Sequence, residues 1–154
     1  MINIRRYRPG DEEELWRLFR NTIRRVAIAD YTEEQVRRWA PDTVDPERWR
    51  QRMAGINPFI AVCDTVIVGY ADVQPSGLID HFFIHHDWQR RGVGRRLMER
   101  IHTEAATLSL TQLHSEVSIT ARPFYEAHGF RVDEQQTVDM DGVTAINFKM
   151  SKTL

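Results

Sequence analysis

The sequence predicts a mixed α/β (α+β) fold, with a mostly antiparallel sheet of six to seven strands and helices on both faces. Two observations lead to this prediction. Helical patterns fill the chain from one opening strand to about residue 55, and a run of three strand patterns begins at residue 59. Helix and strand then alternate before a closing strand pair. A chain of 154 residues can bury one sizeable core, so we expect a single domain over residues 1–154.

Start and stop signals place the elements of the first third of the chain. Residues 2–6 alternate apolar and polar side chains, as a half-buried strand does. Thr32 with Gln35 three positions later forms a capping box, which predicts the start of a helix. The predicted segments are a strand over 2–6, a helix capped by Asp11, a helix from Thr32 to about Trp39, and a helix from Asp45-Pro46 to Gly55.

Strand patterns dominate the rest of the chain, interrupted by two helices. Asp64-Thr65 and Asp141-Gly142 each separate two β-branched or apolar runs, which predicts two hairpins. The further predicted segments are strands over Phe59–Cys63, Val66–Val73 and Ile79–Ile84, a helix over Val93–Leu108, a strand over Leu113–Val117, a helix over Ala121–His128, and strands over Val132–Met140 and Val143–Met150.

The composition excludes several functional classes. The net charge is −1 and the pI is near 6.6, which argues against a nucleic-acid partner. No apolar stretch approaches the roughly 20 residues that a membrane helix needs, and residues 1–14 lack the apolar core of a secretory signal. The single cysteine, Cys63, excludes an internal disulfide and suits a reducing compartment. We therefore expect a cytoplasmic protein without a membrane or nucleic-acid partner, and a homodimer stays open.

A glycine turn between a predicted strand and a predicted helix is the strongest local signal. Gly92-Val93-Gly94 precedes the long amphipathic helix, where unpaired N–H groups and the helix dipole favour an anion. A dinucleotide fingerprint would have a third glycine at Leu97, and the Gly-Lys-Ser/Thr ending of a phosphate loop is absent. The turn by itself thus allows an anion site or a plain structural turn.

Four arginines around the glycines favour the anion site. Arg90, Arg91, Arg95 and Arg96 crowd the start of the helix, where positive side chains oppose the dipole by about 0.3–1 kcal/mol each. A bound polyanion would supply the missing negative charge. A merely solvated cluster is the alternative.

Two motifs in this order resemble those of the GNAT superfamily, the acetyl-CoA-dependent N-acetyltransferases. Gln89–Gly94 (QRRGVG) matches the Q/R-x-x-G-x-G/A signature, and His85–Trp88 resembles the family's H-P-E-Y/W lead-in. Ala121–Phe130 (ARPFYEAHGF) resembles the A-x-x-F-Y-E-x-x-G-F segment downstream. The order of predicted elements extends the resemblance to nearly the whole chain. Within the family, Trp39-Ala40-Pro41 and Ile79–Phe83 (IDHFF) resemble a subgroup of small bacterial acetyltransferases.

The resemblance implies an acetyl-CoA site along these motifs. The pyrophosphate of coenzyme A would sit on the backbone N–H groups of residues 91–96, and the pantetheine arm would lie along the backbone of the fourth strand. Where the family often has Asn, this chain has Ser118, which can still hydrogen-bond the pantetheine. The implied contacts come from Phe82, Phe83, Ile84, Gln89, Arg90, Arg91, Gly92, Val93, Gly94, Arg95, Arg96, Ser118 and Tyr125.

Tyr125 matches the family's proton donor to the leaving thiolate. A phenol of pKa about 10 beside a thiol of pKa about 8.5 is a suitable donor. A packed aromatic beside Phe124 is the alternative interpretation.

The acceptor amine needs a base, because it must be neutral when it attacks. If the turn is symmetric about Ser76, Asp72 faces Asp80 across a hairpin, and two close carboxylates raise the pKa of one. We therefore predict Asp80 as the base, supported by Asp72. His81 is the second choice, because a local bulge could exchange the two faces. A shifted register with two exposed acids is the alternative.

No metal site is predicted. His81 and His85 lie too far apart along a strand to share an ion, and His85 and His86 are expected to point in opposite directions. Cys63 is expected to be a buried strand residue without a catalytic role.

The predicted function is transfer of an acetyl group from acetyl-CoA to a primary amine of an unidentified small molecule or peptide by direct attack. The acceptor would enter beside Tyr31, Trp39 and Trp49, where aromatics with acidic neighbours would suit a cationic amine. A non-catalytic acyl-CoA-binding or sensing module on the same fold is the alternative, and Tyr125 and Asp80 favour the enzyme. An RNA-targeting acetyltransferase is disfavoured by the net charge of −1.

Overall fold

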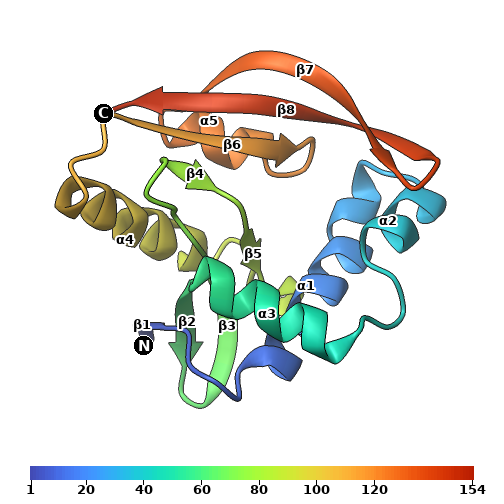
Figure 1. The fold of residues 1–154 in the computed structure, drawn as a ribbon, viewed down its shortest axis with the longest axis horizontal. Helices are drawn as coiled ribbons and strands as arrows, with labels where there is room; N and C mark the ends of the chain where they lie inside the picture. The colour runs from blue at the N-terminus through green and yellow to red at the C-terminus, as the bar shows by residue number, and fades with distance from the viewer.

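The computed structural model describes residues 1–154 and has two four-stranded sheets with five α-helices and two short 3-10 helices around them (Figure 1). No helix is long and apolar enough to cross a membrane. The elements are β1 (Ile2–Arg6), α1 (Glu12–Arg25), η1 (Ala27–Ala29), α2 (Glu33–Trp39), α3 (Pro46–Ile56), β2 (Phe59–Cys63), β3 (Val66–Ala71), β4 (Leu78–Ile79), β5 (Phe82–Ile84), η2 (His86–Trp88), α4 (Val93–Thr107), β6 (Gln112–Ser118), α5 (Arg122–Ala127), β7 (Arg131–Met140) and β8 (Val143–Thr153).

The predicted fold class is confirmed, and the sheet is divided in two. The first sheet has the order β1-β2-β3-β5 and is antiparallel throughout. The second has the order β4-β6-β8-β7, in which only β4 and β6 are parallel. The structure has eight strands where six to seven were expected, because the predicted strand Ile79–Ile84 is interrupted at Asp80-His81.

A buried carboxylate causes this interruption. Asp72 is fully buried, and its Oδ1 accepts hydrogen bonds from the backbone N–H groups of Asp80 (3.0 Å) and His81 (2.5 Å). Its Oδ2 accepts a third bond from Gln74 Nε2 at 2.7 Å. A side chain that satisfies two successive backbone donors replaces the ladder bonds that would continue the strand. The chain thus leaves the second sheet after β4 and enters the first as β5.

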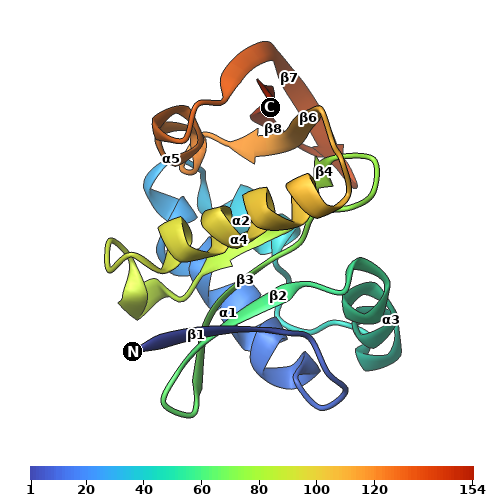
Figure 2. The same ribbon diagram turned by 90° about the vertical axis from the view of Figure 1, so that its left-hand side faces the viewer.

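Helices cover both faces of the first sheet. Alternate residues of β2 point to opposite faces, so Phe59 and Ala61 belong to one core cluster and Ile60 to the other. Val93, Leu97 and the rest of the apolar side of α4 fill the first cluster, and Figure 2 shows α4 lying across the strands. The α1, α2 and α3 helices fill the second cluster on the opposite face. The predicted helix positions on both faces are confirmed.

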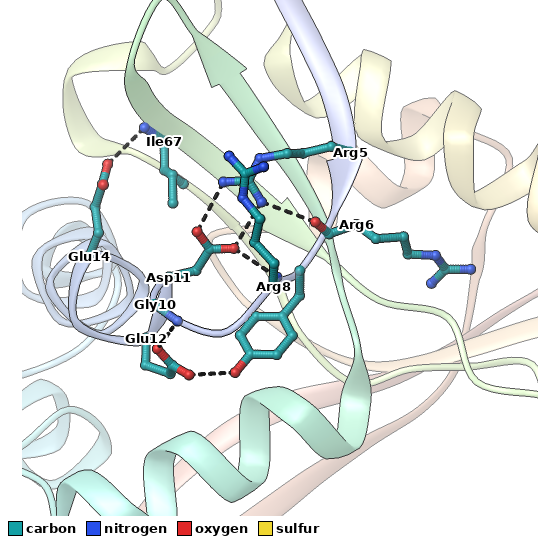
Figure 3. Close-up of polar contacts among 9 residues, drawn as sticks. Arg5, Arg6, Arg8, Gly10, Asp11, Glu12, Glu14 and Ile67 are labelled. Carbon is teal, nitrogen blue, oxygen red and sulfur yellow. Dashed lines mark hydrogen bonds and ion pairs between the residues drawn. The ribbon is translucent and has the colours of Figure 1, made fainter.

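The start of α1 is fixed by polar contacts rather than by the predicted cap (Figure 3). Asp11 makes no side-chain capping bond; its carboxylate pairs with the Arg5 guanidinium at 2.8 and 2.9 Å and accepts the Arg8 N–H at 3.0 Å. Burial alone would raise the pKa of Asp11, but these hydrogen bonds outweigh it and lower the pKa. Glu14 accepts the N–H of Ile67 at 2.8 Å. These contacts join α1 to the first sheet at both β1 and β3.

Candidate active site

Two strands that begin side by side separate in the middle of the molecule. β4 runs parallel to β6, with Leu78 opposite His114 and Ile79 opposite Ser115. The strand that follows, β5, pairs only with β3 in the other sheet. The side of β5 that faces away from β3, which we call the open edge, therefore has no strand partner (Figure 1).

The open edge belongs to alternate residues of β5. In an antiparallel ladder, bonded and non-bonded pairs alternate. The ladder is bounded by hydrogen bonds from Asp72 N to His81 O (3.1 Å) and from His85 N to Val68 O (2.9 Å). Phe83, opposite Tyr70, therefore directs its backbone groups to β3, and Phe82 and Ile84 direct theirs to the open edge. The predicted backbone contact with pantetheine is thus open to Phe82 and Ile84 but not to Phe83.

One of the open-edge carbonyls is already occupied. Ile84 O accepts hydrogen bonds from Thr22 Oγ1 and from Gln89 Nε2, both at 2.8 Å. Gln89 thereby holds the glycine loop against the end of β5, which gives this predicted ligand a structural task. The free backbone groups of the open edge are the N–H and C=O of Phe82 and the N–H of Ile84.

The glycine loop continues directly from β5 and η2 into α4. Gly92 has a φ of +84°, which favours glycine, and a Cβ added there would meet no atom within 4 Å. The space beside Gly92 is therefore open to a ligand. The first turn of α4 leaves the N–H groups of Val93, Gly94 and Arg95 without helical partners. The N–H of Arg96 bonds to Gly92 O at 3.1 Å, so the predicted range 91–96 is one residue too long.

The four arginines of the loop are all exposed, as a solvent-facing anion site requires. Arg91 lies over the Trp88 ring at 5.1 Å, and Arg95 pairs with Glu99 at 3.9 Å. Arg90 and Arg96 make no ion pair. The backbone of Arg90 has a φ of +59°, an uncommon conformation for a residue with a side chain.

Tyr125 lies where β5 and β6 diverge. Its ring packs edge-on against Phe82 of β5 (5.9 Å between centroids) and against Phe130 (5.0 Å). Burial raises the pKa of Tyr125, and the nearby Ser115 hydroxyl of β6 opposes the rise. The phenol therefore stays protonated and next to the open edge, as a proton donor must. Its packing role and its proposed role as donor are compatible.

Ser118, predicted to contact pantetheine, ends β6. Its Oγ accepts the N–H of Ala121 at 3.1 Å and so stabilises the turn into α5. The next N–H, of Ile119, donates to the hydroxyl of Tyr31 at 2.9 Å. Tyr31 also donates to Ile146 O at 2.6 Å and thereby joins the helical layer to β8.

A cleft of about 1750 Å³ lies between the helical layer and the second sheet. Helices α1, α2 and α3 supply an aromatic wall, and β6, β7 and β8 supply the facing wall. Asp80 and His81, at the interruption between β4 and β5, line the cleft between these walls. The aromatic residues of the cleft are Phe19, Tyr31, Trp39, Trp49 and Phe83, which includes all three residues predicted to flank the acceptor.

The two predicted carboxylates do not face each other. The register is symmetric about Ser76 near the turn, where Gln74 N bonds to Leu78 O, but it shifts by one residue before His81. Asp72 therefore lies opposite His81, and the predicted pairing with Asp80 is wrong. Burial is the main cause that raises the pKa of Asp72 to about 6, and the nearby Asp80 charge adds less. This one-residue shift is the local bulge that was considered as a way to exchange the faces of Asp80 and His81.

Asp80 and His81 have different environments. Asp80 is exposed, and the guanidinium of Arg52 lies 3.1 Å from its carboxylate. His81 is only 7% exposed, its Nδ1 lies 3.0 Å from the Tyr70 hydroxyl, and burial lowers its pKa to about 4. Sequence reasoning missed Tyr70 and Arg52. Tyr70 is the only hydroxyl in the apolar run of β3, and Arg52 shares a helical face with Arg48, which are the signals that could have identified them.

The histidine pair beside the glycine loop differs from the prediction. The rings of His85 and His86 stack at 4.4 Å instead of pointing apart, because the strand ends and a 3-10 turn begins at His86. With Asp87 they offer ligand atoms within 4.8 Å of one another. However, His85 Nδ1 already accepts the Asp87 N–H at 3.0 Å, and Arg25 lies 3.3 Å from His86 Nε2. A guanidinium at that distance opposes a second cation, so we assign no metal there.

Comparison with known proteins identifies relatives along the whole chain. The acetyltransferase (GNAT) domain family matches residues 27–152. An uncharacterised N-acetyltransferase of Escherichia coli K12, YafP, is 31% identical over 149 residues, which cover 97% of this chain and 94% of that protein. A GCN5-related N-acetyltransferase from Rhodopseudomonas palustris has a TM-score of 0.94 at 28% identity, over 99% of this chain and 95% of that one.

A further solved structure shares the fold at lower identity. The PaiA N-acetyltransferase of Thermoplasma acidophilum, in complex with coenzyme A, has a TM-score of 0.76 at 16% identity, over 100% of this chain and 99% of that one.

Proposed function

We propose, from the premise that this chain belongs to the GNAT family and is an N-acetyltransferase, that it moves the acetyl group of acetyl-CoA to a primary amine by direct attack. The observation that carries this proposal is the open edge of β5. It continues into the glycine loop at one end and lies beside Tyr125 and Asp80 at the other. The proposed acetyl-CoA site, the acid Tyr125 and the base Asp80 therefore all border one short strand.

Binding of acetyl-CoA follows the free backbone groups. The N–H groups of Val93, Gly94 and Arg95 suit the pyrophosphate, and the space beside Gly92 admits it. The exposed Arg90 and Arg96 complete the charge around the phosphates. The amide groups of pantetheine then bond to the open edge as an added strand does.

The chemistry uses a base and an acid on opposite sides of the thioester. Asp80 takes a proton from the acceptor ammonium, and the resulting neutral amine forms a bond to the acetyl carbon. The open-edge N–H groups of Phe82 or Ile84 stabilise the negative charge that develops on the carbonyl oxygen. The carbon–sulfur bond breaks, the leaving thiolate takes the proton of Tyr125, and the proton that the nitrogen loses as the amide forms restores the phenol. No enzyme nucleophile is required.

An acceptor screen tests this function. Free CoA and the acetylated product are measured with a panel of amines that covers small molecules and peptides. We expect equal amounts of CoA and acetylated product with at least one acceptor. Tight binding of acetyl-CoA, with no CoA release for any amine, would instead favour a sensing module and end the enzyme proposal.

A further inference from the structure

We propose that His81 is a specificity-determining residue that donates its Nε2–H to a carboxylate of the acceptor, and that the acceptor is a free α-amino acid with an apolar side chain. The inference deepens the proposed function and rests on it, because it names the class of amine that occupies the cleft.

The His81 ring is held in one orientation by its neighbours. It stacks on Phe19 with 5.7 Å between the ring centroids and packs edge-on against Phe83 at 5.6 Å. The Trp49 ring lies 6.2 Å away on a third side. A ring packed in this way cannot rotate freely, so the direction of its two nitrogens is part of the structure.

The Tyr70 hydroxyl determines which nitrogen carries the proton. Tyr70 is fully buried, and His81 Nδ1, at 3.0 Å, is the only hydrogen-bond partner of its hydroxyl. If Nδ1 carried the hydrogen, the buried Tyr70 O–H would have no acceptor, which is costly. Tyr70 therefore donates to Nδ1, and a neutral His81 carries its hydrogen on Nε2.

The Nε2–H of His81 faces the cleft. It makes no hydrogen bond within the protein. It is also not fully buried, because the buried polar atoms without a partner are His86 Nδ1 and Ser151 Oγ. His81 lines the cleft, so this donor is available to a ligand. In the resting tautomer the ring offers a donor rather than a base, which leaves the base role to Asp80 next to it.

The charges of the cleft favour an anionic group beside α3. Arg48 and Arg52 line the cleft one helical turn apart. Arg52 is paired with Asp80, whereas Arg48 is exposed and makes no ion pair. Of the acids on the facing wall, Asp133 pairs with Arg131 and Glu134 with Lys149, whereas Glu116 makes no ion pair and accepts a hydrogen bond from Gln136 Nε2. Arg48 is therefore the unpaired cation on the side of the cleft that α3 supplies.

The positions of Asp80 and His81, neighbours in the chain that both line the cleft, fit an α-amino acid. Asp80 would receive the amine and the adjacent His81 the carboxylate, so the two substrate groups must also be close, as they are on the two sides of one carbon. Trp39 and Phe83, which line the cleft and are less buried than Phe19 and Trp49, then offer an apolar surface for the side chain of the amino acid.

The first test compares matched acceptors. CoA release is measured with phenylalanine and leucine, and with phenethylamine and 3-methylbutylamine, which lack only the carboxylate. We expect kcat/KM about tenfold to a hundredfold higher for the amino acids, as for a hydrogen bond to a charged group. Equal values for the amino acid and the amine in both pairs would overturn the inference.

The second test separates recognition from folding and from turnover. In ¹⁵N-histidine-labelled wild-type protein, we expect the Nε2–H tautomer of His81, and a shift of Nε2 on addition of phenylalanine but not of phenethylamine. In Tyr70→Phe, which lacks the hydroxyl that donates to His81 Nδ1, we expect His81 to populate both neutral tautomers. His81→Gln, which keeps an N–H donor, should keep more of the preference for amino acids than His81→Leu.

The outcomes distinguish the two proposals. An Nδ1–H tautomer, or an Nε2 that responds to neither compound, would overturn the inference. If no acceptor were acetylated while Nε2 still responded to phenylalanine alone, the proposed function would fail and the amino-acid site would stand.

Discussion

The carboxylate of Asp72 and the backbone N–H of His81 are 2.5 Å apart, and this contact separates the two sheets. Asp72 also accepts the N–H of Asp80, so two successive donors turn away from the ladder. The chain then moves from β4 in one sheet to β5 in the other. The open edge, the cleft and the position of His81 all depend on this one buried acid.

Replacing Asp72 with alanine should destabilise the protein strongly. The change leaves the buried N–H of His81 and the partly buried N–H of Asp80 without an acceptor, at about 1–3 kcal/mol for a fully buried group. We expect the free energy of unfolding in urea to fall by about 2–5 kcal/mol. Glu34→Ala, which removes an exposed acid, is the matched control and should change it by less than about 0.5 kcal/mol. An equally small effect for Asp72→Ala would contradict the assigned role.

The pH dependence of stability should reveal two opposing groups. The pKa of Asp72 is raised from 3.8 to about 6, so its contribution to stability is present below pH 3.8 and lost as pH rises through 6. The pKa of His81 is lowered from 6.5 to about 4, so its contribution is present above pH 6.5 and lost as pH falls through 4. Each is worth about 3 kcal/mol from the size of the shift, and the two largely cancel in the wild type.

Single variants should separate these two contributions. Between pH 4 and 6.5, the unfolding free energy of Asp72→Asn should rise with pH more steeply than that of the wild type, because only His81 remains. That of His81→Gln should fall with pH, because only Asp72 remains. Urea unfolding at several pH values in this window measures both slopes. Parallel curves for the three proteins would show that neither group is perturbed as described.

Replacing Gly92 or Gly94 with alanine should destabilise the protein for different reasons. Gly92 has a φ of +84° but open space, so Gly92→Ala costs about 1–2 kcal/mol in backbone strain and fills the proposed phosphate site. A Cβ on Gly94 would meet the Phe124 ring at 2.9 Å, so Gly94→Ala overpacks the contact between α4 and α5.

We expect KM for acetyl-CoA to rise more in Gly92→Ala than in Gly94→Ala. Phe124→Leu should restore the stability of Gly94→Ala but not that of Gly92→Ala, because only the former has a clash to relieve. Unfolding curves and steady-state kinetics on the four variants test this. Rescue of Gly92→Ala by Phe124→Leu would be inconsistent with these packing roles.

The proposed base should show itself in the pH profile of catalysis. Asp80→Asn should lower kcat by about 10²–10⁴ at neutral pH, because the acceptor amine loses its proton acceptor. The deficit should shrink at high pH, where the free amine needs no base. Asp87→Asn, an exposed acid in η2, is the control. A deficit in Asp80→Asn that is constant across the pH range would exclude Asp80 as the base.

Local signals in the sequence predicted most elements and their ends. The capping box of Thr32 with Gln35 and the hairpin at Asp141-Gly142 are both present, because each depends only on residues a few positions apart. The glycine loop follows β5 directly, as the family motifs led us to expect, and Tyr125 packs against Phe82 at the other end of that strand.

The register around Asp72 could not be predicted in the same way. A hairpin symmetric about Ser76 is the default for its turn, and the bulge arises only because a buried carboxylate competes for the N–H groups of Asp80 and His81. The surroundings of Asp72 also depend on distant residues, because Gln74, which donates to its Oδ2, donates as well to Ile56 O of α3. The same dependence hides the contact between Tyr70 and His81, which lie eleven positions apart.

The most direct test of the central claim is the kcat of Tyr125→Phe, measured by CoA release with an acceptor from the screen, together with acetyl-CoA binding by calorimetry. Tyr125 packs against Phe82 through its ring, which phenylalanine keeps, so binding should change by less than about twofold. Because the leaving thiolate loses its proton donor, kcat should fall by about 10²-fold or more. An unchanged kcat with intact binding would contradict acetyl transfer by the mechanism described.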